Sequence, residues 1–270
     1  MTNINTNAYR VREGTDVELD KFDANDDGGL ERKDGEARFD ELSKRLVQLQ
    51  ELMYAQGKHA LLVVFQAMDA GGKDSTSRKV IGPLNPAGVR VVGFKAPSTI
   101  ERKHDFLWRV HQQTPRRGYI SVFNRSHYED VLVVRVKQLV EQSRGEKRYE
   151  HINAFEKLLV DEGTTIAKFY LHITRQYQKE RLQRRLDRPD KHWKFNPDDL
   201  AERGRWREYQ QAFETALSRC STPGAPWYVV PAERRWFRNL LVAQVLADIM
   251  GDWDMQYPKP TFDPRRIAIE

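Results

Sequence analysis

Leu61-Leu-Val-Val-Phe-Gln-Ala-Met-Asp-Ala-Gly-Gly-Lys-Asp-Ser-Thr76 is an apolar run followed by a glycine–lysine turn and a polar helix start. Glycines let backbone N–H groups converge on one point, a helix N-terminus adds partial positive charge, and a lysine reaches the outer phosphates of a ligand. The stretch therefore predicts a buried strand, a phosphate-binding loop and a helix. An ordinary strand–turn–helix junction is the alternative interpretation.

The loop departs at two places from the general P-loop pattern Gly-x-x-x-x-Gly-Lys-[Ser/Thr]. Ala67 stands at the first glycine, and Asp74 stands where a hydroxyl normally ligates magnesium. Asp69 inside the loop, or Asp74 after it, can replace that hydroxyl as a metal ligand. The sequence therefore predicts an acidic P-loop.

The composition favours a globular protein with an anionic partner. The 270 residues include 45 Lys and Arg against 39 Asp and Glu, which gives a net charge of +6. A positive net charge attracts polyanions at long range, so nucleic acid, an anionic membrane and an inorganic polyanion all stay open. Cys220 is the single cysteine, which excludes an intramolecular disulfide. No leader pattern or membrane-length apolar run is present, and we expect a cytoplasmic protein without membrane association.

Strand and helix patterns alternate along most of the chain. Apolar runs predict strands over 60–65, 89–94, 119–123, 166–173 and 227–230. Helical patterns are expected over 36–55, directly after Gly72, over about 98–113, over about 126–142 and over about 233–250. Such alternation indicates an α/β fold with a central five-stranded parallel sheet in a doubly wound arrangement.

The two ends of the chain differ from this core. Residues 1–35 are polar and rich in aspartate, and we expect an arm that lies over a neighbouring surface or is partly disordered. Residues 36–255 are expected to form one domain, with 256–270 as a tail. Asp23–Asp34 also matches a calcium loop at several positions, but it lacks a clear entering helix and the final glutamate, so an acidic arm is preferred.

A basic insertion separates the fourth and fifth predicted strands. Nine of the twenty residues from Arg175 to Lys194 are Lys, Arg or His, and acidic neighbours are too few to neutralise them. The pattern predicts a helical lid over about 175–205 that shields phosphoryl transfer from water. The candidate phosphate-binding cations of this lid are Arg175, Arg181, Arg185, Lys191 and Lys194. A solvated helix face is the alternative interpretation.

Polar groups also gather at the ends of the second and third predicted strands. Asn124 can orient water on a metal or contact a phosphate, and Arg125 can neutralise transferring charge. Alternatively, Asn124 or Ser126 caps the next helix, with Glu129 completing a capping box. Lys95 follows the second strand and is a further candidate phosphate ligand. Histidine and cysteine spacing does not predict a zinc site.

Several long motifs resemble the polyphosphate kinase 2 family. They are Phe65–Asp74, Gly93–Ser98, Phe106–Arg109, Phe123–Leu132, Lys191–Lys194, Ser221–Trp227 and Val230–Arg238, and the likeness covers about residues 36–250. The resemblance implies a P-loop kinase-like three-layer α/β/α fold with a helical lid. It also implies reversible transfer of the terminal phosphoryl of inorganic polyphosphate to an adenine or guanine nucleotide. Magnesium is the expected cofactor, with manganese as a substitute.

The family's motifs assign roles to individual residues here. Asp69, Lys73 and Arg125 are the expected catalytic residues, and Asp69 is also the expected metal ligand. The expected nucleotide and phosphate ligands are Ala70, Gly71, Gly72, Asp74, Ser75, Asn124 and Glu129. The segment Asn124–Asp130 is similar to the subgroup that accepts both AMP and ADP. A homodimer or homotetramer is expected.

Two other functions stay open at this point. An ATP-dependent nucleoside or nucleotide kinase would share the P-loop and the arginine-bearing lid. A basic nucleic-acid-binding module would share the positive charge, although no reader motif is recognised and nucleic acid is not an expected partner. AMP versus ADP preference, purine preference, polyphosphate length and reaction direction do not follow from the sequence.

Overall fold

The computed structural model describes residues 4–269, and a five-stranded sheet lies at the centre of the molecule. The strands are β1 (Ala60–Gln66), β2 (Val89–Val92), β3 (Ile120–Asn124), β4 (Thr164–His172) and β5 (Trp227–Pro231). Their order is β2-β3-β1-β4-β5 and every strand pair is parallel, as the sequence predicts. The strand order reverses beside β1, and such switch points bind ligands at the carboxyl ends of the strands.

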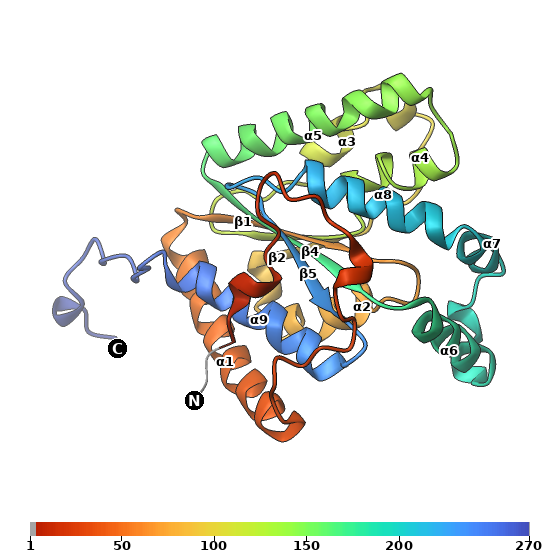
Figure 1. Cartoon of the computed structure of the whole chain (residues 1–270). Coiled ribbons are helices and arrows are strands. Elements are labelled where there is room, and N and C mark those ends of the chain that lie inside the picture. The colour runs from red at the N-terminus through yellow and green to blue at the C-terminus, as the bar shows by residue number, and fades with distance from the viewer. Residues whose placement is uncertain (1–3, 270) are drawn as a thin grey trace.

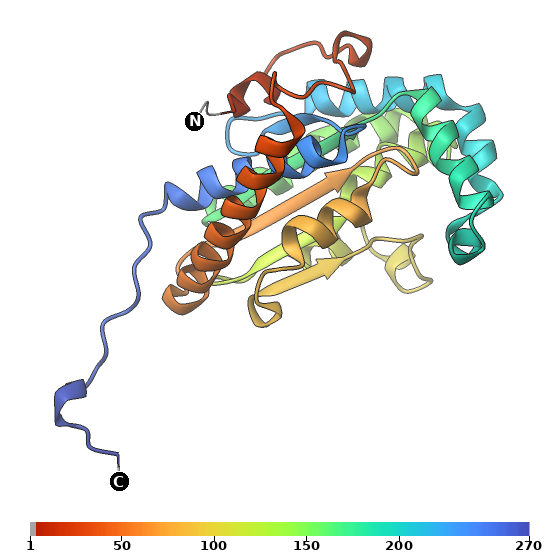
Figure 2. The ribbon, with the colours of Figure 1, turned by 90° about the horizontal axis from the view of Figure 1, so that it is seen from below.

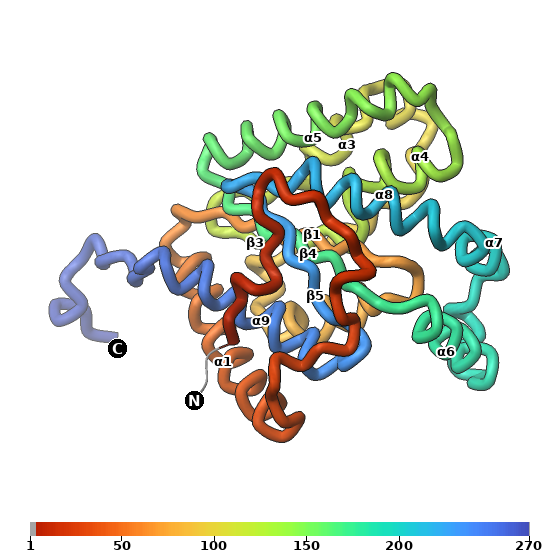
Figure 3. The backbone as a smooth tube through the Cα atoms, in the orientation of Figure 1, coloured from red at the N-terminus to blue at the C-terminus, as the bar shows by residue number. Residues whose placement is uncertain are grey.

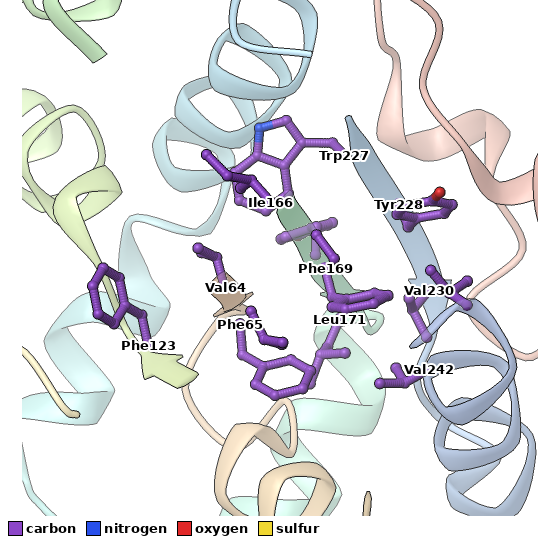
Figure 4. Packing of buried hydrophobic residues seen from close by; sticks show 14 of the residues in the cluster. Val64, Phe65, Phe123, Ile166, Phe169, Leu171, Trp227, Tyr228, Val230 and Val242 are labelled. Carbon is purple, nitrogen blue, oxygen red and sulfur yellow. The ribbon is translucent and has the colours of Figure 1, made fainter. Parts of the chain in front are cut away.

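The central strands are apolar along their whole length because both faces of the sheet are covered. All seven residues of β1 are buried, and β4 is buried at eight of its nine positions. Phe65, Phe169 and Tyr228 stack across β1, β4 and β5, with ring centroids 5.5 and 5.6 Å apart (Figure 4). Burial on both faces explains continuous apolar runs in place of an alternating pattern.

Helices form one layer on each side of the sheet (Figure 1). One layer contains α1 (Arg32–Gln56), α2 (Lys73–Thr76) and α9 (Arg235–Gly251). The other contains α3 (Trp108–His111), α4 (Val133–Val136), α5 (Gln142–Asp161) and α8 (Trp206–Arg219). Two further helices, α6 (Arg175–Leu186) and α7 (Asp198–Gly204), project beyond the carboxyl ends of β1 and β4.

Helix α1 begins at Arg32, earlier than the expected start at residue 36. Its apolar stripe is buried, as periodicity predicts. The helix ends at Gln56, and the C-cap residue Gly57 has the left-handed conformation with a φ of 66°. Gly35 allows α1 to approach α9 closely, because a Cβ there would lie 2.3 Å from the ring of Trp236. The close pair of helices supports the face of the sheet that carries α2.

The helix predicted over about 98–113 is wrong in extent. The segment instead contains a short 3₁₀ turn, Glu101–Lys103, and the four-residue α3. The carboxylate Oδ1 of Asp105 accepts hydrogen bonds from the backbone N–H of Leu107 and Trp108 at 2.9 and 3.0 Å. This local turn competes with a continuous helix.

The helix predicted over about 126–142 is also wrong. A 3₁₀ turn over His127–Asp130 and the short α4 occupy most of the segment. Left-handed backbone at Arg125, with φ 68°, and at Gln138, with φ 53°, interrupts the helical path on both sides. The 20-residue helix α5, which the sequence analysis did not predict, follows and leads into β4.

Residues 4–31 run along the outer edge of β5 (Figure 3). The N–H of Val11 donates to the carbonyl of Trp227 at 2.9 Å, and Arg10 forms an antiparallel bridge with Tyr228. Leu19 is fully buried against the body. The segment therefore covers a sheet edge that would otherwise offer free backbone groups. The proposed domain boundary at residue 35 stays a prediction.

After α9, Trp253 stacks on His59 and Met255 is buried, and residues 256–269 then extend away from the body (Figure 2). They contain a short 3₁₀ turn over Pro264–Arg266. Among the helices of residues 4–269, none combines the length and the apolar character needed to cross a membrane.

Candidate active site

The loop between β1 and α2 forms a tight cradle with Lys73 folded across it. Ala70 and Gly72 have φ values of 61° and 100°, which turn the backbone sharply before the helix. A Cβ on Gly71 would lie 2.7 Å from the Cβ of Ala67 and 2.9 Å from the carbonyl of Met68, so a larger residue cannot fit without a shift. Lys73 Nζ donates to the Ala67 carbonyl at 2.7 Å. Burial lowers the pKa of Lys73, and Asp69 opposes that shift only in part.

Asp69 and Arg125 form an ion pair at the mouth of this loop. The Arg125 Nη2 lies 2.9 Å from Asp69 Oδ1, and the backbone carbonyl of Asp69 accepts from Gln178 of α6 at 3.0 Å. Burial disfavours the charge of Arg125, but Glu129, Asp69 and other nearby carboxylates outweigh it and raise its pKa. The guanidinium is therefore held charged beside the loop.

A cavity of about 240 Å³ opens between the P-loop and helices α4, α7 and α8. We call it the acidic pocket, because its lining includes five carboxylates against three cations. The carboxylates are Asp69, Glu129, Asp198, Asp199 and Glu202, and the cations are Lys73, Arg125 and Lys137. Leu132, Val133 and Phe213 contribute an apolar wall.

The carboxylates of the acidic pocket repel one another. Burial raises the pKa of Glu129, although Arg125 and Lys73 act in the opposite direction. Burial and the nearby charge of Asp69 raise the pKa of Asp199. Within residues 4–269 no ready-made cluster of three metal-binding side chains exists. The carboxylates of the acidic pocket nevertheless fit a cation such as Mg²⁺, because Mg²⁺ commonly binds only one or two carboxylates together with substrate phosphates.

The structure confirms the cap at Ser126 in the segment after β3, and the ligand-binding roles of Asn124 and Arg125 stay predictions. Asn124 Nδ2 donates to Asp74 Oδ1 at 2.6 Å, so the amide joins the P-loop helix. Ser126 Oγ accepts from the N–H of Tyr128 at 3.2 Å and caps the next turn. Glu129 lines the acidic pocket. The loop thus combines a structural cap at Ser126 with two charged groups, Arg125 and Glu129, that line the acidic pocket.

A buried polar network lies behind this loop. Lys168 of β4 donates to Glu156 at 2.5 Å, to the hydroxyl of Tyr128 at 2.8 Å and to the carbonyl of Cys220 at 2.6 Å. The carboxylate of Glu156 also accepts from Tyr128 at 2.8 Å and lies 3.1 Å from His127 Nε2. His127 and Tyr128 directly follow Arg125 and Ser126 in the chain. The network therefore anchors the loop that carries Arg125.

The lid region was predicted to contain Lys and Arg residues without acidic partners, and the structure matches this prediction only in part. Arg185 lies 3.3 Å from Asp199, and both Lys191 and Arg188 pair with Asp190 at 2.9 and 3.1 Å. The expectation that acidic partners are too few is wrong for Arg185, whereas Arg188 and Lys191 share the single carboxylate of Asp190. Local pairing inside a turn and across α6 and α7 was not visible from charge counting alone.

The other predicted cations lie in different places. Lys95 and Arg175 are exposed, and their backbone carbonyls accept from Arg109 and Arg203 at 2.8 and 2.7 Å. Lys194 lies over the ring of Trp193. None of these cations lines the acidic pocket.

Arg181 is placed differently, because it lies over Tyr177 on α6 and close to cations of α9. The remaining predicted ligands, Ala70 and Ser75, belong to the P-loop and the first turn of α2. Ser75 Oγ contacts Arg238 of α9 at 3.1 Å.

Several groups that surround the loop were not predicted from the sequence. Asp198, Asp199 and Glu202 belong to the lid segment, where the excess of basic residues dominates the sequence pattern. Arg235 and Arg238 follow the last strand, so the strand-end rule applied to Lys95 and Asn124 would also have found them.

The segment that resembles a calcium loop uses its side chains within the protein. Asp23, Asp26 and Asp27 accept hydrogen bonds from backbone N–H groups two residues later, at 2.8 to 3.0 Å. Asp26 also accepts from the hydroxyl of Tyr9 at 2.6 Å, and Asp27 pairs with Arg234 at 2.8 Å. The pair of Asp27 with Arg234 joins the arm to the N-cap of α9.

A parallel sheet, a glycine–lysine loop at its switch point and an acidic pocket beside it define a P-loop phosphotransferase. The profile of the family described as Polyphosphate kinase 2 (PPK2) matches residues 29–258. The chain therefore belongs to the polyphosphate kinase 2 family.

Individual relatives agree with this assignment. An AMP/ADP-polyphosphate phosphotransferase from Meiothermus ruber is 52% identical, over 97% of this chain and 99% of its own length. An ADP-polyphosphate phosphotransferase from Rhodopseudomonas palustris is 43% identical over 99% of this chain and 97% of its own. The crystal structure of a polyphosphate kinase 2 from Arthrobacter aurescens matches with a TM-score of 0.91 at 41% identity, covering 94% of this chain and 92% of that chain. The P-loop kinase-like fold is thereby confirmed, and the alternative functions are not favoured.

Proposed function

We propose that the protein transfers the terminal phosphoryl group of inorganic polyphosphate to ADP, to AMP or to both, reversibly. The observation that carries the proposal is the acidic pocket directly beside the P-loop lysine. An acidic pocket suits an acceptor nucleotide that arrives with a divalent cation, whereas the loop suits the phosphates at the point of transfer. Family membership and the names of the two relatives support the same activity.

The reaction requires one bond to form and one to break. An oxygen of the acceptor's terminal phosphate attacks the terminal phosphorus of polyphosphate, and the bond to the bridging oxygen breaks. The polyphosphate chain leaves one phosphate shorter. Such in-line transfer depends mainly on alignment and on stabilisation of spread charge, so no covalent enzyme intermediate is required.

The residues at the loop have complementary roles in this mechanism. Lys73 and the backbone amides from Ala70 to Gly72 hold the transferring phosphate. To do so, Lys73 gives up its hydrogen bond to the Ala67 carbonyl and donates to the phosphate instead. Arg125 neutralises charge on the same phosphate, and Asn124 holds Asp74 in place. Asp69 would hold Mg²⁺, or Mn²⁺ in its place, with Asp199 as a second carboxylate. A metal held there would neutralise phosphate charge during transfer.

The lid residues act on the donor chain. We propose that Arg175, Arg181, Arg185, Lys191 and Lys194, with Lys95, attract polyphosphate as α6 and α7 move over the loop. Arg185 would then exchange its contact with Asp199 for a phosphate. We further propose a cytoplasmic homodimer or homotetramer that acts on adenine and guanine nucleotides.

Acceptor choice is tested by product analysis. Purified enzyme is incubated with polyphosphate and Mg²⁺ and with either AMP or ADP, in the absence of ATP. We expect ADP and then ATP from AMP, and ATP from ADP. The Asp69→Asn variant serves as the inactive control. Products from neither nucleotide, with a folded enzyme, would refute the proposed function.

A further inference from the structure

Arg125 combines an exposed side chain with a strained backbone. Its φ of 68° lies in the left-handed region, which is uncommon for a residue other than glycine. Such a conformation costs free energy and persists only where the surrounding structure enforces it. The guanidinium pairs with Asp69, the proposed metal ligand, and that pair would be given up when Asp69 holds a metal. Another part of the protein therefore fixes the backbone of Arg125 during transfer.

The three residues after Arg125 are enclosed by the protein. Ser126, His127 and Tyr128 are each at most 1% exposed. The side chains of His127 and Tyr128 both reach Oε1 of Glu156, with His127 Nε2 at 3.1 Å and the Tyr128 hydroxyl at 2.8 Å. Two successive side chains are thus tied to one carboxylate, which fixes the direction in which the backbone leaves Arg125.

Helix α5 supplies these contacts from one face. Glu156 and Arg148 are eight residues apart on α5, so they point the same way, and both are buried. Arg148 Nη1 donates to the backbone carbonyl and to Oδ1 of Asp130 at 2.9 and 3.0 Å. The hydroxyl of Tyr149 donates to the carbonyl of Val131 at 3.4 Å. We call Arg148, Tyr149 and Glu156 the α5 clamp, because together they hold residues 127–131.

Lys168 joins the α5 clamp to the sheet. It lies on β4 directly opposite Val64 of β1, the strand that leads into the P-loop. Its amino group donates to Glu156, to the Tyr128 hydroxyl and to the Cys220 carbonyl, so all three of its N–H donors have acceptors. A buried polar network in which every partner is satisfied rigidifies its surroundings. The loop of Arg125 is therefore fixed relative to the P-loop.

We infer that His127, Tyr128 and Glu156 are positioning residues for phosphoryl transfer, which act by holding Arg125 in its left-handed conformation. The inference rests on the proposed function, in which Arg125 neutralises charge on the transferring phosphate. A donor that is already in place stabilises developing charge without reorganisation. Loss of the positioning contacts should therefore lower kcat and kcat/KM together, with little change in KM.

The Tyr128→Phe variant removes a single hydroxyl from the network. Formation of ATP from ADP and ³²P-labelled polyphosphate is measured with Mg²⁺. The kcat should fall at least fivefold, whereas the KM for each substrate should change less than threefold. Tyr170→Phe is the matched control, because Tyr170 is also fully buried but its hydroxyl has no hydrogen-bond partner among residues 4–269. Its kcat should stay within twofold of the wild-type value.

Two variants of His127 separate hydrogen bonding from packing. Glutamine can present an amide N–H close to the position of Nε2, so His127→Gln should keep at least a third of the wild-type kcat. Leucine has no donor for Glu156, so His127→Leu should lose at least fivefold. Melting temperatures show that both variants are folded at the assay temperature. Equal kcat values in the two variants would contradict a role of the hydrogen bond.

A double-mutant cycle with Arg125→Ala tests whether the network acts through Arg125. In the Arg125→Ala background, Tyr128→Phe should lower kcat by less than twofold, because no guanidinium is left to position. A merely structural effect would lower kcat by the same factor in both backgrounds. The radioactive assay makes the low activity of the Arg125→Ala enzyme measurable.

Three results would overturn the inference. The first is a Tyr128→Phe enzyme whose kcat falls less than fivefold, and the second is an equal effect of Tyr128→Phe in the two backgrounds of the cycle. The third is an Arg125→Ala enzyme with the wild-type kcat, because the network would then have no residue through which to act. If the wild-type protein itself forms no ATP, the proposed function fails first, so the two failures are distinguishable.

Discussion

Replacement of Lys168 by methionine should strongly destabilise the protein. Lys168 is fully buried and neutralises Glu156, which is also buried. In Lys168→Met, the Glu156 carboxylate keeps its hydrogen bond from Tyr128 at 2.8 Å and its contact with His127 but has lost its lysine. Loss of one partner of a buried ion pair costs about 3–5 kcal/mol. We expect a decrease of that size in the free energy of unfolding.

The pH dependence of this decrease has a definite sign. Burial acts to raise the pKa of Glu156, but Lys168 and His127 outweigh it, so the pKa is lowered in the folded wild type. Its contribution to stability is therefore present above the unfolded-state pKa and is lost as pH falls through the lower folded-state pKa. In Lys168→Met the unneutralised carboxyl takes up a proton more readily, so the difference from wild type should shrink as pH falls from 7 to about 4.5.

Urea unfolding at several pH values measures both effects. Lys157→Met is the matched control, because Lys157 pairs with Asp161 at 2.7 Å on an exposed face and should cost less than about 1 kcal/mol. The double variant Glu156→Leu, Lys168→Met should recover part of the loss, since no buried charge stays unpaired. A Lys168→Met protein within about 1 kcal/mol of wild type at pH 7 would refute the reasoning.

Four further predictions concern the P-loop. Asp69→Asn should abolish most turnover while the circular dichroism spectrum and melting temperature stay close to wild type; substantial remaining turnover would contradict its role. Lys73→Ala should lower kcat/KM by roughly 3 kcal/mol of transition-state stabilisation. Burial lowers the pKa of Lys73. The affinity of the wild type for tripolyphosphate should therefore decline as the pH is raised above neutral and Lys73 loses its proton. An affinity that does not change at alkaline pH would argue against binding by a charged Lys73. Gly72 has a φ of 100°, and a Cβ there would lie 2.1 Å from Arg238. The Gly72→Ala variant should therefore lose about 1–3 kcal/mol of the free energy of unfolding, measured by thermal unfolding. An unchanged melting temperature would show that the loop relaxes freely.

The sheet was predictable because its strands are buried on both faces. The apolar runs of β1 and β4 have no periodicity that competes with a strand, and their bounds follow the runs closely. Helix α1 was predictable for a related reason, since its buried stripe is regular over many turns. The start of α1 at Arg32 could not be predicted, because the residues of its first turn are polar and do not contribute to the apolar periodicity.

The region after β3 was mispredicted because its breaks come from non-glycine residues. Arg125 and Gln138 adopt positive φ angles. Positive φ is uncommon for arginine and glutamine, so it could not be predicted from the residue types. Tertiary contacts hold Arg125 in that conformation, including its ion pair with Asp69. The sequence could therefore place polar groups at this strand end but could not show that the helix was interrupted.

The candidate site was predictable where its residues belong to one local segment. Asp69 and Lys73 lie in the loop, and Arg125 and Glu129 follow the adjacent strand; the structure brings all four to one pocket. Asp199 and Arg238 lie far away in the chain, and their proximity to the loop depends on how α7 and α9 pack. Charge counting also could not show that Arg185 pairs with Asp199 across the lid.

The origin of the transferred phosphoryl group tests the account most directly. Wild-type enzyme is incubated with ADP, Mg²⁺ and ³²P-labelled polyphosphate in the absence of ATP. The account predicts label at the γ-phosphate of new ATP, in equal amount to the phosphate lost from polyphosphate, with no such product from Asp69→Asn. Label released only as free phosphate, with no labelled ATP, would contradict it.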